Sequence, residues 1–294
     1  TWRVPTRPAR SDGRTCGCIG QPGDRPDQTH RGPHGPPLWG APVAVSALRG
    51  GIGFLSTLPV GAGPRDWEAF RGAPWVFPLI GLLLGLGPAV ILLLPLPAMA
   101  QPVIAVTLLY LLVGITHLDG LADTLDAMAA HHLTTPTGRR EVMHDHSIGV
   151  AAVGAVTLTL AGLIGGYGSL HGVAAPGILG VVLLAEVLAK TAMALLVCLS
   201  SPAHAGLGAS VIERAGPDDL WWVALAALPG VLVGIAGGVG VAGTMILTAL
   251  LLTWAIHRAS LGFIGGVSGD LLGATNELVR LGTLYAGVIA WTLW

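Results

Sequence analysis

A series of apolar runs, several close to the length that crosses a bilayer, most constrains what this 294-residue chain can form. A helix of about 20 apolar residues spans the hydrocarbon core of a membrane. The chain is 52% hydrophobic and 11% charged, whereas a soluble domain carries about 25% charged residues. The sequence therefore predicts an all-α fold, a polytopic membrane helical bundle. The runs are Val43–Val60, Val76–Leu96, Pro102–Leu118, Ile148–Tyr167, Val173–Leu199, Leu220–Val239, Val241–Ile256 and Leu281–Trp294.

The first run differs from the rest. Val43–Val60 is short and contains Arg49, and if it crossed the membrane it would carry a basic segment with it. We therefore predict about seven spans, preceded by an N-terminal re-entrant or interfacial helix. Residues 1–40 are rich in Pro, Gly, Arg and Asp without periodicity, so we expect a disordered tail before an integral membrane domain at residues 41–294.

The connections between the runs alternate in character. Segments 61–75, 119–147, 200–219 and 257–280 are long and charged, whereas 97–101, 168–172 and the turn near Gly240 are short and uncharged. Arginines gather in the long connections, and positive charge marks the cytoplasmic side. The sequence thus predicts a multi-pass protein of the cell (inner) membrane whose functional groups lie on the cytoplasmic face. A net charge of −1 gives no case for nucleic acid as a partner.

Asp119, Asp123 and Asp126 follow the third run directly. On a helix, positions i, i+4 and i+7 fall within roughly 60° of arc. Carboxylates on one stripe repel each other and are costly near a membrane, and a divalent cation removes both penalties. Oxygen ligands favour Mg²⁺ or Mn²⁺, ions that typically carry phosphate. A solvated acidic helix face outside the bilayer is the alternative.

A second polar segment covers residues 139–149. If it is helical, Glu141 and Asp145 lie at i, i+4, and together with the aspartate triplet they would hold a metal pair for phosphoryl transfer. Pairing of these carboxylates with Arg139 and Arg140 is the alternative. The histidines 117, 131, 132, 144 and 146 lack zinc-site spacing, so we expect secondary roles in substrate binding, or solvated loop side chains.

A third segment, residues 264–277, combines glycines with Asp270, Asn276 and Glu277. Its glycines allow a ligand to approach the backbone, and the polar groups add oxygen ligands. A packed membrane hairpin would explain the same glycines. Segment 201–208 has no decisive chemistry of its own. Glu186 and Lys190 lie at i, i+4 inside a span, either as an ion pair or with Lys190 contacting a phosphate.

In this order the motifs resemble the cobalamin-5′-phosphate synthase family, also called adenosylcobinamide-GDP ribazoletransferase. The resemblance covers most of the chain from about Ala47 to Arg280, and the aspartate segment is its most specific part. Departures from the family pattern are Thr57, Ala127, Ser147 and His204. The matching segments are Ala47-Leu-Arg, Phe54-Leu-Ser-Thr-Leu-Pro-Val60, Phe77-Pro-Leu-Ile-Gly81, Asp119-Gly-Leu-Ala-Asp-Thr-Leu-Asp126, Met143-His-Asp-His-Ser-Ile-Gly149, His204-Ala-Gly-Leu-Gly208 and Gly265-Gly-Val-Ser-Gly-Asp270.

The resemblance implies transfer of cobinamide phosphate from adenosylcobinamide-GDP to α-ribazole or its 5′-phosphate, with release of GMP. It implies a Mg²⁺ cofactor, with Mn²⁺ as a substitute, in a lipid bilayer; homo-oligomerisation is left open. Asp126 or Asp145 is the expected general base. The expected catalytic and metal-binding residues are Asp119, Asp123, Asp126 and Asp145, and the expected substrate-binding residues are Arg139, Arg140, His146, Lys190, His204, Gly269, Asp270, Asn276 and Glu277.

Two rival classes remain. A CDP-alcohol phosphatidyltransferase-like lipid enzyme also uses Asp-Gly segments, but its pattern places Arg where this chain has Asp123 after Ala122. A cation-coupled transporter would need broken helices and polar groups near the membrane midplane. In this sequence the aspartates gather on one face, and we expect only Glu186 and Lys190 to lie deep.

Overall fold

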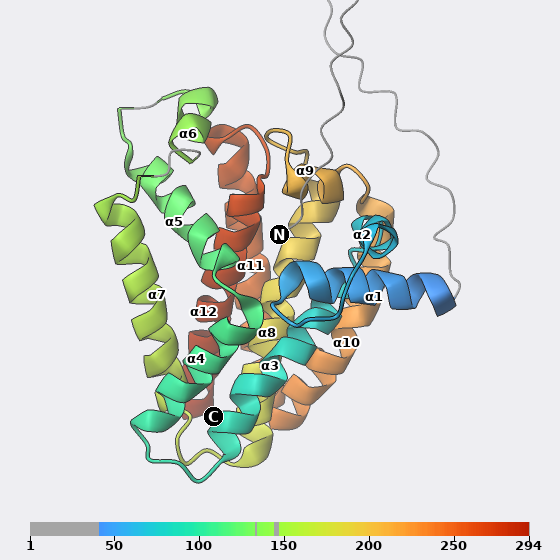
Figure 1. Ribbon diagram of the computed structural model, residues 1–294. Helices are drawn as coiled ribbons and strands as arrows, with labels where there is room; N and C mark the ends of the chain where they lie inside the picture. Colours follow the sequence, from blue (N-terminus) through green and yellow to red (C-terminus); the bar gives the residue numbers. More distant parts are fainter. Residues whose placement is uncertain (1–40, 133, 144–146, 294) are drawn as a thin grey trace, which may run out of the picture. The chain divides into compact units, whose positions relative to one another are not determined.

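The computed structural model describes residues 41–132, 134–143 and 147–293, and these form helices joined by short loops (Figure 1). Within these residues no strand forms beyond an isolated bridge between Pro202 and Val267, so the all-α prediction is confirmed. The helices are α1 (Ala41–Leu55), α2 (Pro64–Arg71), α3 (Val76–Leu93), α4 (Ala100–Val113), α5 (Thr116–Ala129), α6 (Pro136–Met143), α7 (Val150–Gly168), α8 (Ala175–Leu199), α9 (Leu207–Ile212), the 3₁₀ turn η1 (Pro217–Asp219), α10 (Leu220–Gly237), α11 (Val239–Phe263) and α12 (Gly269–Leu293).

Five of these helices are long and apolar enough to cross a membrane: α3, α7, α8, α10 and α11. A sixth span results if α4 and α5, which are bent by 93° relative to each other, count as one. The sequence predicted about seven spans. The difference comes from α12, which is 25 residues long but carries Asp270, Glu277 and Arg280 and is therefore less apolar. The predicted connection 257–280 is likewise mostly helix, because α11 continues to Phe263 and α12 begins at Gly269.

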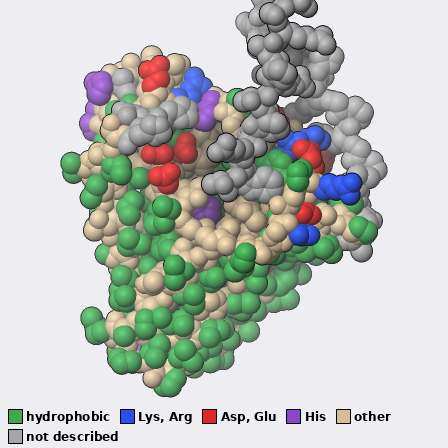
Figure 2. Space-filling model, in the orientation of Figure 1, with side chains coloured by type: hydrophobic (Ala, Val, Ile, Leu, Met, Phe, Trp, Pro, Cys, Tyr) green, Lys and Arg blue, Asp and Glu red, His purple; other side chains and the backbone are tan. Residues whose placement is uncertain are grey.

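Helix α8 forms the centre of the bundle. It packs against α3, α10, α11 and α12, and 89% of its most apolar 18-residue stretch is buried inside the protein. In the corresponding stretches of α10 and α11 only 22% and 28% are buried, because leucines such as Leu232 and Leu250 point outward. Apolar side chains therefore cover much of the surface of the bundle (Figure 2). Exposed apolar surface on this scale fits a helical protein that is solvated by lipid.

The break between α4 and α5 depends on Gly114, whose φ of 79° is a conformation that L side chains rarely adopt. The segment after α1 satisfies the end of α4: the backbone N–H of Thr57 donates to the Leu112 carbonyl at 2.8 Å, and its hydroxyl contacts the same turn. Thr57, a departure from the family pattern, therefore has a structural role here. Helix α1 is shorter than a span, in line with the predicted re-entrant or interfacial helix.

The orientation of α5 is set by its close contact with α12. A Cβ atom on Gly120 would lie 2.6 Å from the carbonyl oxygen of Asp270, so only glycine permits this approach. Helices α5, α6 and α9 lie at one end of the bundle, and the α3–α4 and α7–α8 connections lie at the other (Figure 1). The aspartate segment and the glycine-rich segment, about 150 residues apart in sequence, are thereby brought together.

Candidate active site

A cavity of about 640 Å³ lies where α5 meets the first turn of α12. Asp119, Asp123 and Asp126 of α5 and Asp270 of α12 line it, together with His204 and Gly269. The three residues do lie on one helix, as predicted, and all three carboxylates border the cavity. Acidic side chains gather beside this hollow in the space-filling view (Figure 2).

The three α5 aspartates differ in their surroundings. Asp119 is exposed, whereas Asp123 and Asp126 are half-buried. Asp126 caps the start of α7: its Oδ2 accepts the Gly149 N–H at 2.6 Å and its Oδ1 accepts the Ala152 N–H at 2.9 Å. Helix N-termini leave N–H groups without intrahelical partners, and a carboxylate satisfies them well. Asp126 thus joins α5 to α7 as well as lining the cavity.

Two loops form the neighbouring part of the site. Residues 201–203 pair with Val267, through Ala203 N–H to Val267 O at 2.9 Å and Val267 N–H to Ser201 O at 2.9 Å. Ser268 caps α12, because the Leu271 N–H donates to its Oγ at 3.2 Å. The segments 201–208 and 264–277, which the sequence treated separately, therefore form one unit beside the aspartates.

Arg139 and Arg140, which were predicted to bind substrate, support these loops instead. Neither lines the cavity within the described residues. Arg140 of α6 donates to the Ala203 carbonyl and to Thr137, and the Arg139 guanidinium lies 4.9 Å from the centre of the Phe263 ring. These contacts tie α6 to the 201–208 loop and to α11. Asp145 and His146 lie outside the described residues, as does His144.

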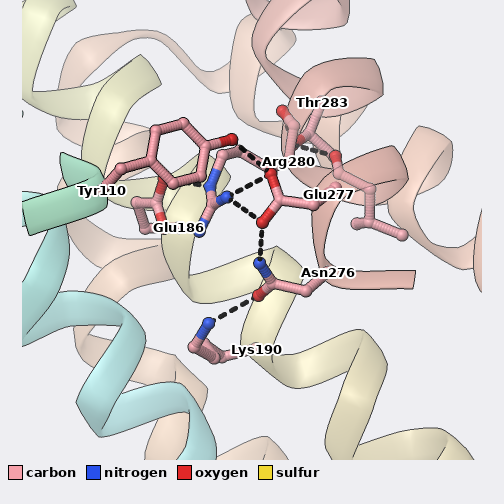
Figure 3. Close-up of polar contacts among 8 residues, drawn as sticks. Tyr110, Glu186, Lys190, Asn276, Glu277, Arg280 and Thr283 are labelled. Carbon is pink, nitrogen blue, oxygen red and sulfur yellow. Dashed lines mark hydrogen bonds and ion pairs between the residues drawn. The ribbon is translucent and has the colours of Figure 1, made fainter. Parts of the chain in front are cut away.

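Three predicted substrate-binding residues, Lys190, Asn276 and Glu277, lie in a buried polar network instead of the cavity lining (Figure 3). Lys190 donates to Asn276 Oδ1 at 2.6 Å, and Asn276 donates to Glu277 Oε1 at 3.0 Å. All three side chains are fully buried. Because Lys190 has no exposed surface, it is not in contact with a phosphate site in this conformation.

Arg280 is the centre of this network, and the sequence interpretation missed it. Its guanidinium donates to Glu277 at 2.6 Å and to Glu186 Oε1 at 2.6 Å, and the Tyr110 hydroxyl donates to Glu277 Oε2 at 2.7 Å. The expected pair between Glu186 and Lys190 is replaced by the pair between Glu186 and Arg280. The sequence places Arg280 at the end of the charged connection 257–280, but the side chain is fully buried within α12.

The described residues contain no group of three His, Cys, Asp or Glu side chains positioned to hold a metal ion. Mg²⁺ is commonly held by one or two carboxylates and substrate phosphates, not by a complete protein cage. Asp119 and Asp123, one helical turn apart at the cavity, match that donor set. The residues therefore fit Mg²⁺ as an ion shared with a phosphorylated substrate.

A helical bundle with a lipid-facing surface and an acidic cavity at one end defines a polytopic membrane protein. The chain belongs to the cobalamin-5-phosphate synthase family, whose model matches residues 47–288. It is similar to the adenosylcobinamide-GDP ribazoletransferase of Haloquadratum walsbyi, 41% identical over 85% of this chain and 100% of that protein. The enzyme of the same name from Halorubrum lacusprofundi is 40% identical over 85% and 99%, and that from Pseudomonas paraeruginosa 35% over 83% and 98%. No solved structure is significantly similar.

Two features that a transporter would need, a broken helix and additional buried polar groups, are present. The α4–α5 pair is a broken helix, and Glu277, Asn276 and Arg280 lie deep in addition to Glu186 and Lys190. The expectation that only the last two would be deep is wrong. In this chain these buried polar and charged groups form hydrogen bonds and ion pairs with one another. A broken helix and buried charges therefore do not by themselves indicate transport.

Proposed function

We propose that this chain transfers cobinamide phosphate from adenosylcobinamide-GDP to α-ribazole or α-ribazole 5′-phosphate, forming adenosylcobalamin or its 5′-phosphate and GMP. The observation that carries the proposal is the row of α5 carboxylates that borders a cavity, in a chain of this family. An acceptor hydroxyl oxygen forms a bond to the phosphorus on the cobinamide side. The bond from that phosphorus to the bridging oxygen breaks, and GMP leaves with that oxygen.

The proton of the acceptor hydroxyl passes to a carboxylate of the site. Asp126 is the least suited of the α5 aspartates, because both of its oxygens already accept backbone N–H groups. Asp119 and Asp123 are the better candidates within the described residues. Gly269, exposed at the first position of α12, presents backbone to the cavity beside them, and a helix N-terminus favours bound phosphate.

We propose Mg²⁺ as the cofactor, replaceable by Mn²⁺, held by Asp119 and Asp123 together with the diphosphate. When bound, the ion would neutralise the diphosphate and stabilise the negative charge on the leaving GMP. Asp270, from the adjoining turn of α12, lines the same cavity and completes its acidic border. His204 and Gly269 border the space that remains for the phosphates.

The test is to incubate the purified protein in vesicles with adenosylcobinamide-GDP, α-ribazole and Mg²⁺, and to measure GMP and the cobalamin product. We expect stoichiometric release of GMP, which stops after exhaustive chelation with EDTA and returns when Mg²⁺ is added. Absence of product in the complete mixture would contradict the proposed transfer. Full activity after chelation would contradict only the metal.

We further propose that the protein resides in the inner cell membrane with this cavity on the cytoplasmic side. The support is the arginine content of the connections at the cavity end. Thr137 and Ser169 are both exposed; Thr137 belongs to α6 at the cavity end, and Ser169 starts the α7–α8 connection at the other end (Figure 1). In a background lacking Cys16, Cys18 and Cys198, an impermeant thiol reagent added to intact cells should label a cysteine at Ser169 and spare one at Thr137. The reverse labelling would invert this orientation.

A further inference from the structure

Part of the cavity lining is apolar and comes from helices other than α5 and α12. We call it the apolar wall; it consists of Phe54, Leu55, Phe77, Val113, Met193 and Val211. All but Phe54 are at most 5% exposed and belong to one contiguous apolar cluster. The cavity therefore has two chemically different sides, one of carboxylates and one of buried hydrocarbon.

Aromatic rings support the apolar wall from behind. The Phe70 ring lies 5.4 Å from that of Phe54 and 5.4 Å from that of Phe77, and Phe54 also lies 5.0 Å from Trp67. Rings in contact at such distances are held in fixed orientations. Phe54 and Phe77 thus offer a preformed surface against which a flat apolar group can pack.

The size of the cavity limits what can occupy it. Pockets of about 300–1,000 Å³ enclose ligands of drug size. A cavity of about 640 Å³ has room for a nucleoside and the reacting phosphates, but not for the whole of the larger donor beside them. We therefore expect the bulky corrin ring to lie toward the opening, which leaves the enclosed apolar wall to a smaller group.

Two flat groups take part in the proposed reaction, the base of the acceptor nucleoside and the guanine of the donor. Guanine carries several hydrogen-bond donors and acceptors, which would lose their partners against hydrocarbon. The base of α-ribazole is a benzimidazole with two methyl groups and few polar atoms. Resting on the proposed function, we propose that the apolar wall binds the aromatic base of the acceptor nucleoside and directs its ribose hydroxyl toward the α5 carboxylates.

His117 adds a polar contact to this subsite. It lines the same cavity, is 8% exposed, and its Nδ1 is buried without a hydrogen-bond partner among the described residues. An unsatisfied buried nitrogen costs free energy, and a bound nucleoside can supply the missing hydrogen bond. His117 is therefore placed to select a ligand that combines an apolar ring with a few hydrogen-bonding atoms.

The test compares two matched variants, Met193→Ala in the apolar wall and Met245→Ala in α11. Both methionines are buried, but Met245 belongs to a second apolar cluster and contacts Gly287. Equilibrium binding of α-ribazole to the purified full-length protein is measured beside that of the analogue without the two methyl groups. A methyl group in an apolar pocket changes affinity about 10-fold or more, so the wild-type protein should prefer α-ribazole by at least that factor.

Met193→Ala should lose most of this preference and weaken α-ribazole binding about 10-fold, with unchanged KM for adenosylcobinamide-GDP. Met245→Ala should retain the wild-type preference. If Met193→Ala does not fold, Val113→Ala is the second variant. Equal binding of both nucleosides by the wild type, or a rise in donor KM alone, would overturn the subsite. Binding of α-ribazole without GMP release would instead overturn the proposed transfer and leave the subsite standing.

Discussion

Glu186 and Glu277 differ from Asp119 and Asp123 in their burial and in their place in the molecule. The two glutamates are fully buried, and both accept hydrogen bonds from Arg280 at 2.6 Å. The two aspartates border the cavity, where Asp119 is exposed and Asp123 half-buried. One protein thus holds acidic groups that a buried arginine neutralises and acidic groups that border a cavity, where we propose that a cation binds.

The difference teaches how to separate structure from chemistry among charges in a membrane protein. A charge in the bilayer is costly unless it is paired, so the buried network must be complete before any ligand binds. The cavity carboxylates are where we propose that Mg²⁺ and the diphosphate bind, and the ion would offset their negative charge. Substitutions in the two regions should therefore fail in different ways, and the four predictions below test this.

The largest effect is expected for Arg280→Met. It leaves Glu186 and Glu277 buried without their cation, a change that costs about 3–5 kcal/mol. We expect little folded protein, measured as the monodisperse fraction in detergent and by the thermal midpoint. The triple variant that adds Glu186→Gln and Glu277→Gln should recover much of the loss. A stable single variant would show that the network is unimportant for folding.

Next, Asp119→Asn and Asp123→Asn should each reduce turnover at least ~100-fold, as expected on loss of a metal ligand or general base. The thermal midpoint should be unchanged or slightly higher, because a repelling charge is removed. Glu213→Gln is the matched control, since Glu213 is exposed and absent from the described cavity lining. Near-normal turnover in both aspartate variants would show that the chemistry lies elsewhere.

A smaller effect is expected for Lys190→Met. The variant leaves Asn276 Oδ1 without its donor, which costs about 1–3 kcal/mol for a buried acceptor. Stability should fall while the KM for adenosylcobinamide-GDP stays constant. A large rise in that KM at constant stability would instead indicate that Lys190 contacts a phosphate, and it would move this residue from the buried group to the cavity group.

A loss of stability smaller than that expected in the buried network is predicted for Asp126→Ala, which removes the cap of α7 and costs about 0.5–2 kcal/mol. Because Asp126 also lines the cavity, this variant should lose both stability and turnover. It would thereby combine the loss of stability expected in the buried network with the loss of turnover expected at the cavity. Unchanged stability would mean that the start of α7 is held by other contacts.

The sequence predicted those features that depend on neighbouring residues. Apolar runs identified α3, α7, α8, α10 and α11, and the spacing of three aspartates predicted the stripe on α5. It could not reveal that Arg280 pairs with Glu186, because these residues are 94 positions apart and nothing in local spacing links them. Lys190 shows the same limit, since its helical neighbour Glu186 appeared to be its partner but Asn276 is.

The bend at Gly114 was also missed, because Pro102–Leu118 has the composition of an uninterrupted span. The positive φ of Gly114 and the contact of α4 with Thr57 distinguish this bent segment from a straight span, and neither can be recognised in the sequence. Of the predicted site residues, Asp119, Asp123, Asp126, His204, Gly269 and Asp270 line the cavity, whereas Lys190, Asn276 and Glu277 lie in the buried network. Short sequence motifs therefore predict a surface that is built from loops and helix N-termini better than they predict contacts between the middles of two helices.

The packing of α5 on α12 has a consequence for the order of events during biosynthesis. Helix α4 has 14 residues, about 21 Å at 1.5 Å per residue, which is shorter than a bilayer core of about 30 Å. Helix α12 follows all the other helices, so α5 must leave the ribosome long before the turn that supports Gly120 exists. The nascent chain is therefore expected to insert its earlier apolar helices first and to acquire a competent cavity only after α12 has been synthesised.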